Sequence, residues 1–379
     1  MIRRLQQANL DILHQIEILQ DLIGSVSVPG ELMPYVVCIS GRLEALRSAG
    51  RRNIQDLQYG IPETIPDILS ATQSLMQEFE LVNSLYASPI TRGSEGDELA
   101  LSLLRWLHDS HPKTKQLAFG LSNGNFAIYP TPKIPPIYLL PVSRQHSLLY
   151  LSLFFHEFGH LLYAHHKPEM DDLVRDFLQV VGDHVSPQAM RDPSTSGRDD
   201  EFRLQLLSVW YAWVQEIFCD AVGLSIGGPS FLKALSHFSC IRSPEQYYVP
   251  RGKQLQRKHP VTWIRIKMLV DHARKLDYVV LADDVERGWC DIARTMKIRE
   301  DYEGTWAEEF LLPLRKAVED MLEEAQPPQA DQKAFNPSSH EDYSDPVWLL
   351  NFAWHMFEAD SKTYKSWERT AIQKYLQHR

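Results

Sequence analysis

The feature that most constrains this chain is a pair of histidines and a glutamate inside a long apolar run, LSLFFHEFGHLLYAHH, at residues 151–166. His156 and His160 are four residues apart, so an α-helix places both imidazoles on one face. The flanking apolar residues recur as a buried helix requires. Burying these histidines with Glu157 costs free energy unless the three groups pair or bind a metal. The spacing therefore predicts a buried helix that binds zinc, with Glu157 beside the metal as a candidate base.

A catalytic zinc site needs a third protein ligand and an open position, and a second apolar segment offers one. This segment, VWYAWVQEIFCDAVGL, covers residues 209–224. Glu216 and Asp220 share one helical face, so Glu216 could bind the metal while Asp220 accepts the outer N–H of a ligand histidine. The alternative is that both carboxylates pair with arginines in a structural network.

A third element follows at residues 259–265, where His259 precedes a proline suited to the first turn of a helix and Arg265 lies on that helix. In order and spacing, the H-E-x-x-H, E-x-x-x-D and H-P-x-x-x-x-R patterns resemble the HtpX and CAAX-prenyl-protease family of gluzincin peptidases. The resemblance covers about 120–270. Cys219 departs from it, because the family usually has a small residue there.

The resemblance implies a zinc-dependent endopeptidase that holds one zinc ion per chain and cleaves a protein or peptide substrate. Membrane-spanning helices typical of the family are not expected here, so a soluble relative is implied and the family's lipidated substrates do not transfer. His259 could donate to the oxyanion, with Arg265 orienting it or the Asp220 carboxylate. The implied roles are zinc ligands His156, His160 and Glu216, general base and acid Glu157, ligand support Asp220, and site-lining His259 and Arg265.

Two alternatives to a general endopeptidase stay open. The first is a highly specific regulatory protease that the N-terminal or C-terminal helices hold latent until it is activated. The second is a non-catalytic binding protein with a structural zinc, which predicts four protein ligands and no water position. Glu157 speaks against the second alternative, because a purely structural site does not need it.

The charge balance and the cysteines limit the partners and the location. A net charge of -10 gives no broad cationic surface, so nucleic acid is not an expected partner. Residues 147–164 and 204–226 approach membrane-spanning length, but both contain ionisable side chains and are expected to be buried helices, with no membrane span. Asp11 and Glu17 interrupt any N-terminal export signal. The four cysteines form no C-x-x-C pair, which favours reduced thiols and a cytoplasmic location.

Periodicity predicts a mainly α, α+β protein with a zincin-like core and a small sheet. Strands are expected at LAFGL, NFAIYP and IYLLP between 117 and 142, with Ser-Asn-Gly as a tight turn after the first. Part of 125–141 could pair with an extended substrate backbone. Helices are expected at 1–23, 41–57, 63–86, 97–109, 145–166, 169–184, 200–226, 229–240, 260–275, 278–297, 305–325 and 347–376.

These elements suggest a helical N-terminal region at 1–110, a metallopeptidase core at 111–300, and a C-terminal helical extension at 301–379 with a linker near 326–346. The apolar stripe of 1–23 either closes the protein's own bundle or binds a second copy or a regulatory partner. Residues 347–376 carry too much apolar surface to leave in water, so this segment is expected to dock onto the body.

Four further side chains receive weaker assignments from the sequence. His165 and His166 follow the motif closely and are expected to cap the helix end rather than bind metal. Tyr247 and Tyr248 precede His259 and could contact substrate, although most such tyrosines only pack.

Overall fold

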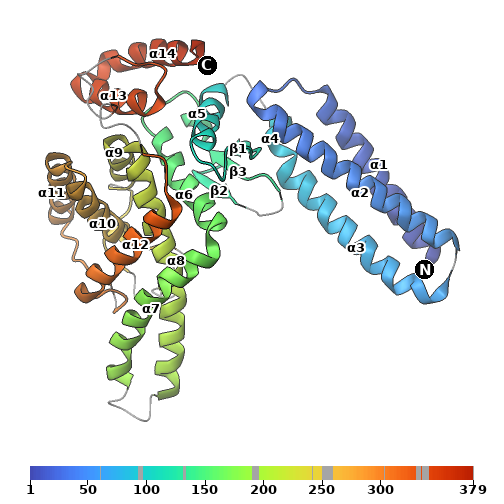
Figure 1. Ribbon diagram of the computed structural model, residues 1–379, viewed down its shortest axis with the longest axis horizontal. Helices are drawn as coiled ribbons and strands as arrows, with labels where there is room; N and C mark the ends of the chain where they lie inside the picture. Colours follow the sequence, from blue (N-terminus) through green and yellow to red (C-terminus); the bar gives the residue numbers. More distant parts are fainter. Residues whose placement is uncertain are drawn as a thin grey trace. The chain divides into compact units, whose positions relative to one another are not determined.

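The computed structural model describes most of the chain, and contacts divide it into two compact units (Figure 1). Unit 1 comprises 1–109 with 114–145, and unit 2 comprises 110–113 with 146–379. The functional boundaries expected near 110 and 300 stay predictions. The description excludes residues 60, 93–96, 131–133, 190–195, 241, 250–258, 303, 330–333, 335–340 and 379, and also the side chains of 62, 185–189 and 196–200.

Unit 1 begins with three long helices: α1 (Ile2–Ser25), α2 (Met33–Tyr59) and α3 (Ile65–Leu81). Asn9 interrupts the stripe of α1 and is itself buried, where its amide donates to Leu5 O and Thr72 Oγ1 at 2.9 Å. The stripe therefore closes the protein's own bundle, while a second copy or regulatory partner at this helix stays a prediction. The apolar stripe consists of the buried residues Leu5, Ile12, Ile16, Leu19 and Ile23.

The chain continues from α3 through a π-helical turn, η3 (Val82–Tyr86), into α4 (Ser88–Arg92) and α5 (Glu98–Asp109). A three-stranded sheet follows, with β1 (Gly120–Asn123), β2 (Ala127–Tyr129) and β3 (Ile137–Leu140). The mainly helical fold with a small sheet is confirmed.

The order of the sheet is β1-β3-β2, with β1 parallel and β2 antiparallel to β3. A tight turn at Ser-Asn-Gly would make β1 and β2 neighbours, but β3 lies between them. Gly124 explains the difference, because its N–H donates to Leu140 O at 3.2 Å and an added Cβ would lie 2.8 Å from the Leu139 side chain. This glycine permits a close approach to β3. The pairing of 125–141 with a substrate stays a prediction.

Unit 2 is helical over most of its described length, and its helices overlap the predicted segments, although the helices predicted from 145 and 305 begin only at Phe154 and Leu311. α6 and α8 pack closely together, α12 packs on α7 and α8, and α10 packs on α8 and α11 (Figure 1). The helices are α6 (Phe154–His165), α7 (Lys167–Ala189), α8 (Ser196–Gly227), α9 (Pro229–Ser239), α10 (Thr262–Lys275), α11 (Val279–Thr295), α12 (Leu311–Ala325), α13 (Pro346–Ala359) and α14 (Ser361–Gln377). Among the described residues, no helix combines the length and apolarity needed to cross a bilayer.

The C-terminal segment forms two helices rather than one, because Asp360 caps a new helix by accepting from Lys362 N at 2.9 Å. Its predicted docking is confirmed within unit 2. Trp354 Nε1 donates to Leu149 O at 3.0 Å, and Glu368 Oε1 accepts from Leu148 N at 2.7 Å. The extension thus holds the chain that leads into α6. About half of the linker predicted near 326–346, residues 330–333 and 335–340, lies outside the described residues.

Candidate metal centre

The candidate centre depends on an unusually close approach of α6 and α8. Gly159 lies between the two histidines of α6 and faces Cys219 of α8, where an added Cβ would come within 2.7 Å of Cys219 Cα. Only a residue without a side chain leaves room for the opposing backbone. The sequence analysis did not single out Gly159, because the crowding comes from the backbone of the distant helix α8 and the residues around Gly159 give no signal of it.

This approach brings the three predicted ligands together. One ligand atom from each of His156, His160 and Glu216 lies within 4.8 Å of the other two. His156 Nε2 and His160 Nε2 each lie 3.5 Å from a different oxygen of Glu216. These separations exceed a good hydrogen bond and are close to the edge of about 3.3 Å expected for a tetrahedron with 2.0–2.1 Å metal–ligand bonds. The donor set therefore fits a divalent metal such as zinc.

Asp220 and Arg265 form a buried ion pair directly behind His156. His156 Nδ1 donates to Asp220 Oδ1 at 2.8 Å, so its Nε2 is left toward the metal position. Arg265 donates to Asp220 through Nε at 2.6 Å and Nη2 at 2.7 Å. The structure thus contains part of each arrangement considered for the two carboxylates. Asp220 pairs with an arginine and also accepts a hydrogen bond from His156, whereas Glu216 faces His156 and His160.

The other two predicted site residues lie at the same place. Glu157 is 7% exposed on the first turn of α6, adjacent to His156. His259 Nδ1 lies 3.1 Å from Glu216 Oε2, although 67% of the His259 side chain is exposed. The structure therefore brings together all seven residues that the sequence pattern selected: His156, Glu157, His160, Glu216, Asp220, His259 and Arg265.

Burial and neighbouring charges give the two ligand histidines opposite pKa shifts in the metal-free protein. Burial lowers the pKa of His156, but the hydrogen bond to Asp220 and the nearby carboxylate of Glu216 outweigh it and raise the value to about 10. For His160, burial and the charge on His156 lower the pKa to about 4. The two histidines therefore differ in how readily they take up a proton, with His156 favouring the protonated form and His160 the neutral form.

The carboxyl groups also differ in their pKa. Burial raises the pKa of Glu157 above the ordinary glutamate value, with the charge on His156 opposing it. Burial acts in the same direction on Glu216, but the close contacts with His156 and His259 and the charge on Arg265 outweigh it and hold its pKa well below the ordinary value. Glu216 therefore favours the ionised form, whereas Glu157 is the carboxyl group better suited to take and return a proton.

The weaker candidates lie outside this cluster. His166 ends α6, where its Nδ1 lies 3.0 Å from Glu324 Oε1, so it contacts α12 and is not in the ligand group. Tyr247 is 1% exposed and donates to Trp289 O at 3.1 Å, so it packs in the interior. The backbone of Tyr248 forms an isolated parallel β-bridge with Asp301.

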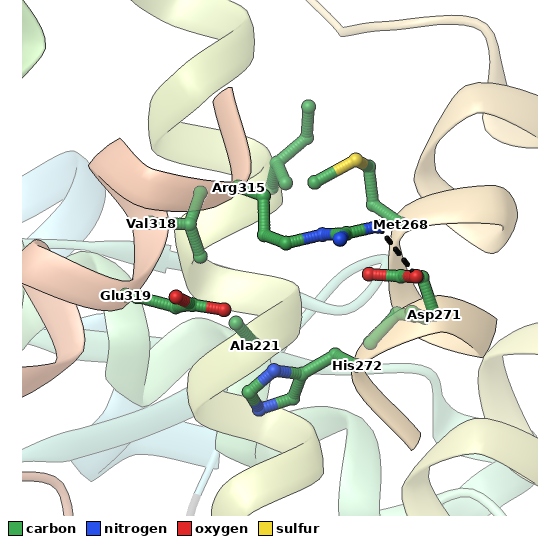
Figure 2. A pocket seen from close by; sticks show the side chains of 9 residues that line it. Ala221, Met268, Asp271, His272, Arg315, Val318 and Glu319 are labelled. Carbon is green, nitrogen blue, oxygen red and sulfur yellow. Dashed lines mark ion pairs between the residues drawn. The ribbon is translucent and has the colours of Figure 1, made fainter. Parts of the chain in front are cut away.

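A small cavity lies on another side of α8, where α8, α10 and α12 meet (Figure 2). Arg315 reaches across it from α12 and pairs with Asp271 of α10 at 2.5 Å. The cavity lies between α12, which belongs to the C-terminal region, and α10, the helix that carries Arg265. It contains none of the predicted ligands, since it is lined by Ile217, Ala221, Met268, Leu269, Asp271, His272, Arg315, Val318 and Glu319.

Comparisons with known proteins found no matching family model, curated protein or solved structure.

Gly159→Ala should lower the free energy of unfolding by about 1–3 kcal/mol, because the methyl group forces α6 and α8 apart. The same shift should weaken metal binding, since the ligands come from both helices. Chemical denaturation and zinc titration would measure the two effects. Gly41→Ala is the matched control, because no atom lies within 4 Å of its added Cβ on helix α2. Equal stability and metal affinity in the Gly159 variant would contradict the close-approach argument.

Proposed function

We propose that this protein is a zinc-dependent endopeptidase of the gluzincin type, with one zinc ion per chain. The observation that carries the proposal is the arrangement of His156, His160 and Glu216 with Glu157 next to the first ligand. The histidines come from α6 and Glu216 comes from α8. If the H-E-x-x-H motif had arisen by chance, there would be no reason for a carboxylate of a second helix to lie beside both histidines.

The chain's own residues divide the work of amide hydrolysis. A zinc ion held by His156, His160 and Glu216 would supply Lewis acidity and lower the pKa of a water to about 7. Glu157 would take the proton from the attacking water and deliver it to the leaving amine, a role suited to its raised pKa. Asp220 orients His156 through the Nδ1 hydrogen bond. Donation from His259 to the oxyanion stays part of this proposal.

The competing zinc-containing binding protein explains the ligands but not Glu157. A buried carboxyl group costs free energy, and a purely structural site has no use for one beside its ligands. The regulatory protease would use the same chemistry and differ in its narrow selectivity and in being held latent until it is activated. Free cysteines, including the exposed Cys38 and Cys290, favour a reducing compartment such as the cytoplasm.

Elemental analysis of the purified protein tests the metal part of the proposal. The wild type should carry one zinc ion, and Glu216→Ala should lose it, because two imidazoles alone bind zinc weakly. Glu323→Ala is the matched control, since this glutamate is exposed on α12. A wild type without zinc would overturn the proposal.

Incubation with a panel of denatured proteins tests the reaction. Cleavage by the zinc-loaded wild type, absent in Glu216→Ala, is the expected result. Zinc without cleavage of any panel member would favour the latent or highly selective protease over the general endopeptidase.

A further inference from the structure

The carboxylate of Glu216 has different neighbours at its two oxygens. Oε1 lies 3.5 Å from His160 Nε2. Oε2 lies 3.5 Å from His156 Nε2 and 3.1 Å from His259 Nδ1. The contact with His259 is the one of these three within ordinary hydrogen-bond distance, so His259 is a direct partner of the acidic ligand.

Arg265 cannot hold Glu216 in the same way. Its Nε and Nη2 are engaged by Asp220, and the remaining Nη1 lies 3.6 Å from Glu216 Oε2. This separation is too long for a hydrogen bond, although the positive charge still favours the carboxylate. Of the three nitrogens near Glu216 Oε2, His259 Nδ1 is therefore the nearest, at 3.1 Å against 3.5 Å for His156 Nε2 and 3.6 Å for Arg265 Nη1.

An exposed histidine usually samples several rotamers, but the backbone of His259 is anchored. Pro260 and Val261 are both buried directly after it, and a residue before proline is restricted to extended conformations. The start of α10 is fixed further by Trp263, which stacks on Trp289 at 5.5 Å and donates to Glu300 Oε1 at 2.7 Å. Anchoring lowers the entropy that His259 loses when it holds Glu216.

We propose that His259 is a positioning residue whose Nδ1–H fixes the Glu216 carboxylate in the orientation that binds the metal. This inference rests on the proposed function and gives His259 a role distinct from donation to the oxyanion. Outer partners of metal ligands typically change metal affinity by about 10- to 100-fold. Removal of His259 should therefore weaken zinc binding, an effect that loss of an oxyanion donor would not produce.

Zinc affinity, measured by competition with a chromophoric chelator, tests the inference without any substrate. His259→Ala should raise the zinc dissociation constant by about 10- to 100-fold. His259→Asn should recover most of this loss, because the Asn side-chain nitrogen can occupy the place of Nδ1. His259→Gln, whose nitrogen lies farther out, should recover less. His14→Ala removes an exposed histidine of unit 1 and should bind zinc like the wild type.

The outcomes separate this inference from the proposed function. Wild-type affinity in His259→Ala would overturn the positioning role and leave the metallopeptidase proposal intact. Affinity in His259→Asn as low as in His259→Ala would also overturn it, because the effect would then not follow the Nδ1 donor. Absence of zinc binding by the wild type would instead defeat the proposed function. Circular dichroism shows whether each variant is folded. If His259→Ala is not folded, the zinc affinities of His259→Asn and His259→Gln test the inference instead, and equal affinities would overturn it.

Discussion

Glu157→Gln should retain zinc and lose peptide hydrolysis, with kcat reduced by about 100- to 10,000-fold. The glutamine side chain has nearly the same shape but can neither take nor return a proton. Glu157 is not among the ligand atoms that cluster at the metal position, so the zinc content should stay at the wild-type level. Replacing a buried carboxyl group by a neutral amide should leave the melting temperature unchanged or higher.

The measurement combines zinc content with the rate of cleavage of a substrate identified in the panel experiment. Glu216→Gln is the matched control, because it makes the same chemical change at a ligand and should lose both zinc and activity. Full activity in Glu157→Gln would contradict the assigned base, whatever its zinc content.

Asp220→Ala should lower the free energy of unfolding by about 3–5 kcal/mol. The substitution leaves Arg265, whose side chain is 13% exposed, without its bidentate partner in the interior. It also removes the acceptor of the His156 Nδ1–H, so zinc affinity should fall by about 10- to 100-fold. Urea denaturation of the metal-free protein and a zinc competition assay measure the two effects.

A double variant separates these two roles of Asp220. Asp220→Leu combined with Arg265→Met removes both buried charges together, so much of the lost stability should return. Zinc affinity should stay low, because neither new side chain accepts from His156. Recovery of zinc affinity along with stability would show that Asp220 acts on the metal only through folding.

The side chains that cluster at the candidate metal centre were predictable, because each is a residue type that binds metals and the spacing within each helix places them on one face. Four-residue spacing places His156 with His160, and Glu216 with Asp220, on single helical faces. The buried helices around them were expected from apolar periodicity alone. The break at Asp360 was not, because one capping aspartate between two apolar segments gives a weak signal in the sequence.

Contacts between distant segments were much harder to predict. The strand order β1-β3-β2 depends on the approach of Gly124 to β3, whereas the local Ser-Asn-Gly signal concerns only a turn. The docking of α13 was expected from its apolar surface, but the particular contact of Trp354 with Leu149 O was not.

The sequence by itself determined which faces are buried and which residue types could bind a metal, because helical periodicity acts over a few residues. The tertiary structure alone decided that Gly159 faces Cys219 and that His259 contacts Glu216 Oε2. Both depend on how α6, α8 and the start of α10 pack across 100 residues of chain, from about 160 to 260. That packing is determined by the volumes of the side chains between the helices and by the anchoring of the backbone. Neither property produces a repeating pattern that can be recognised in a short stretch of sequence.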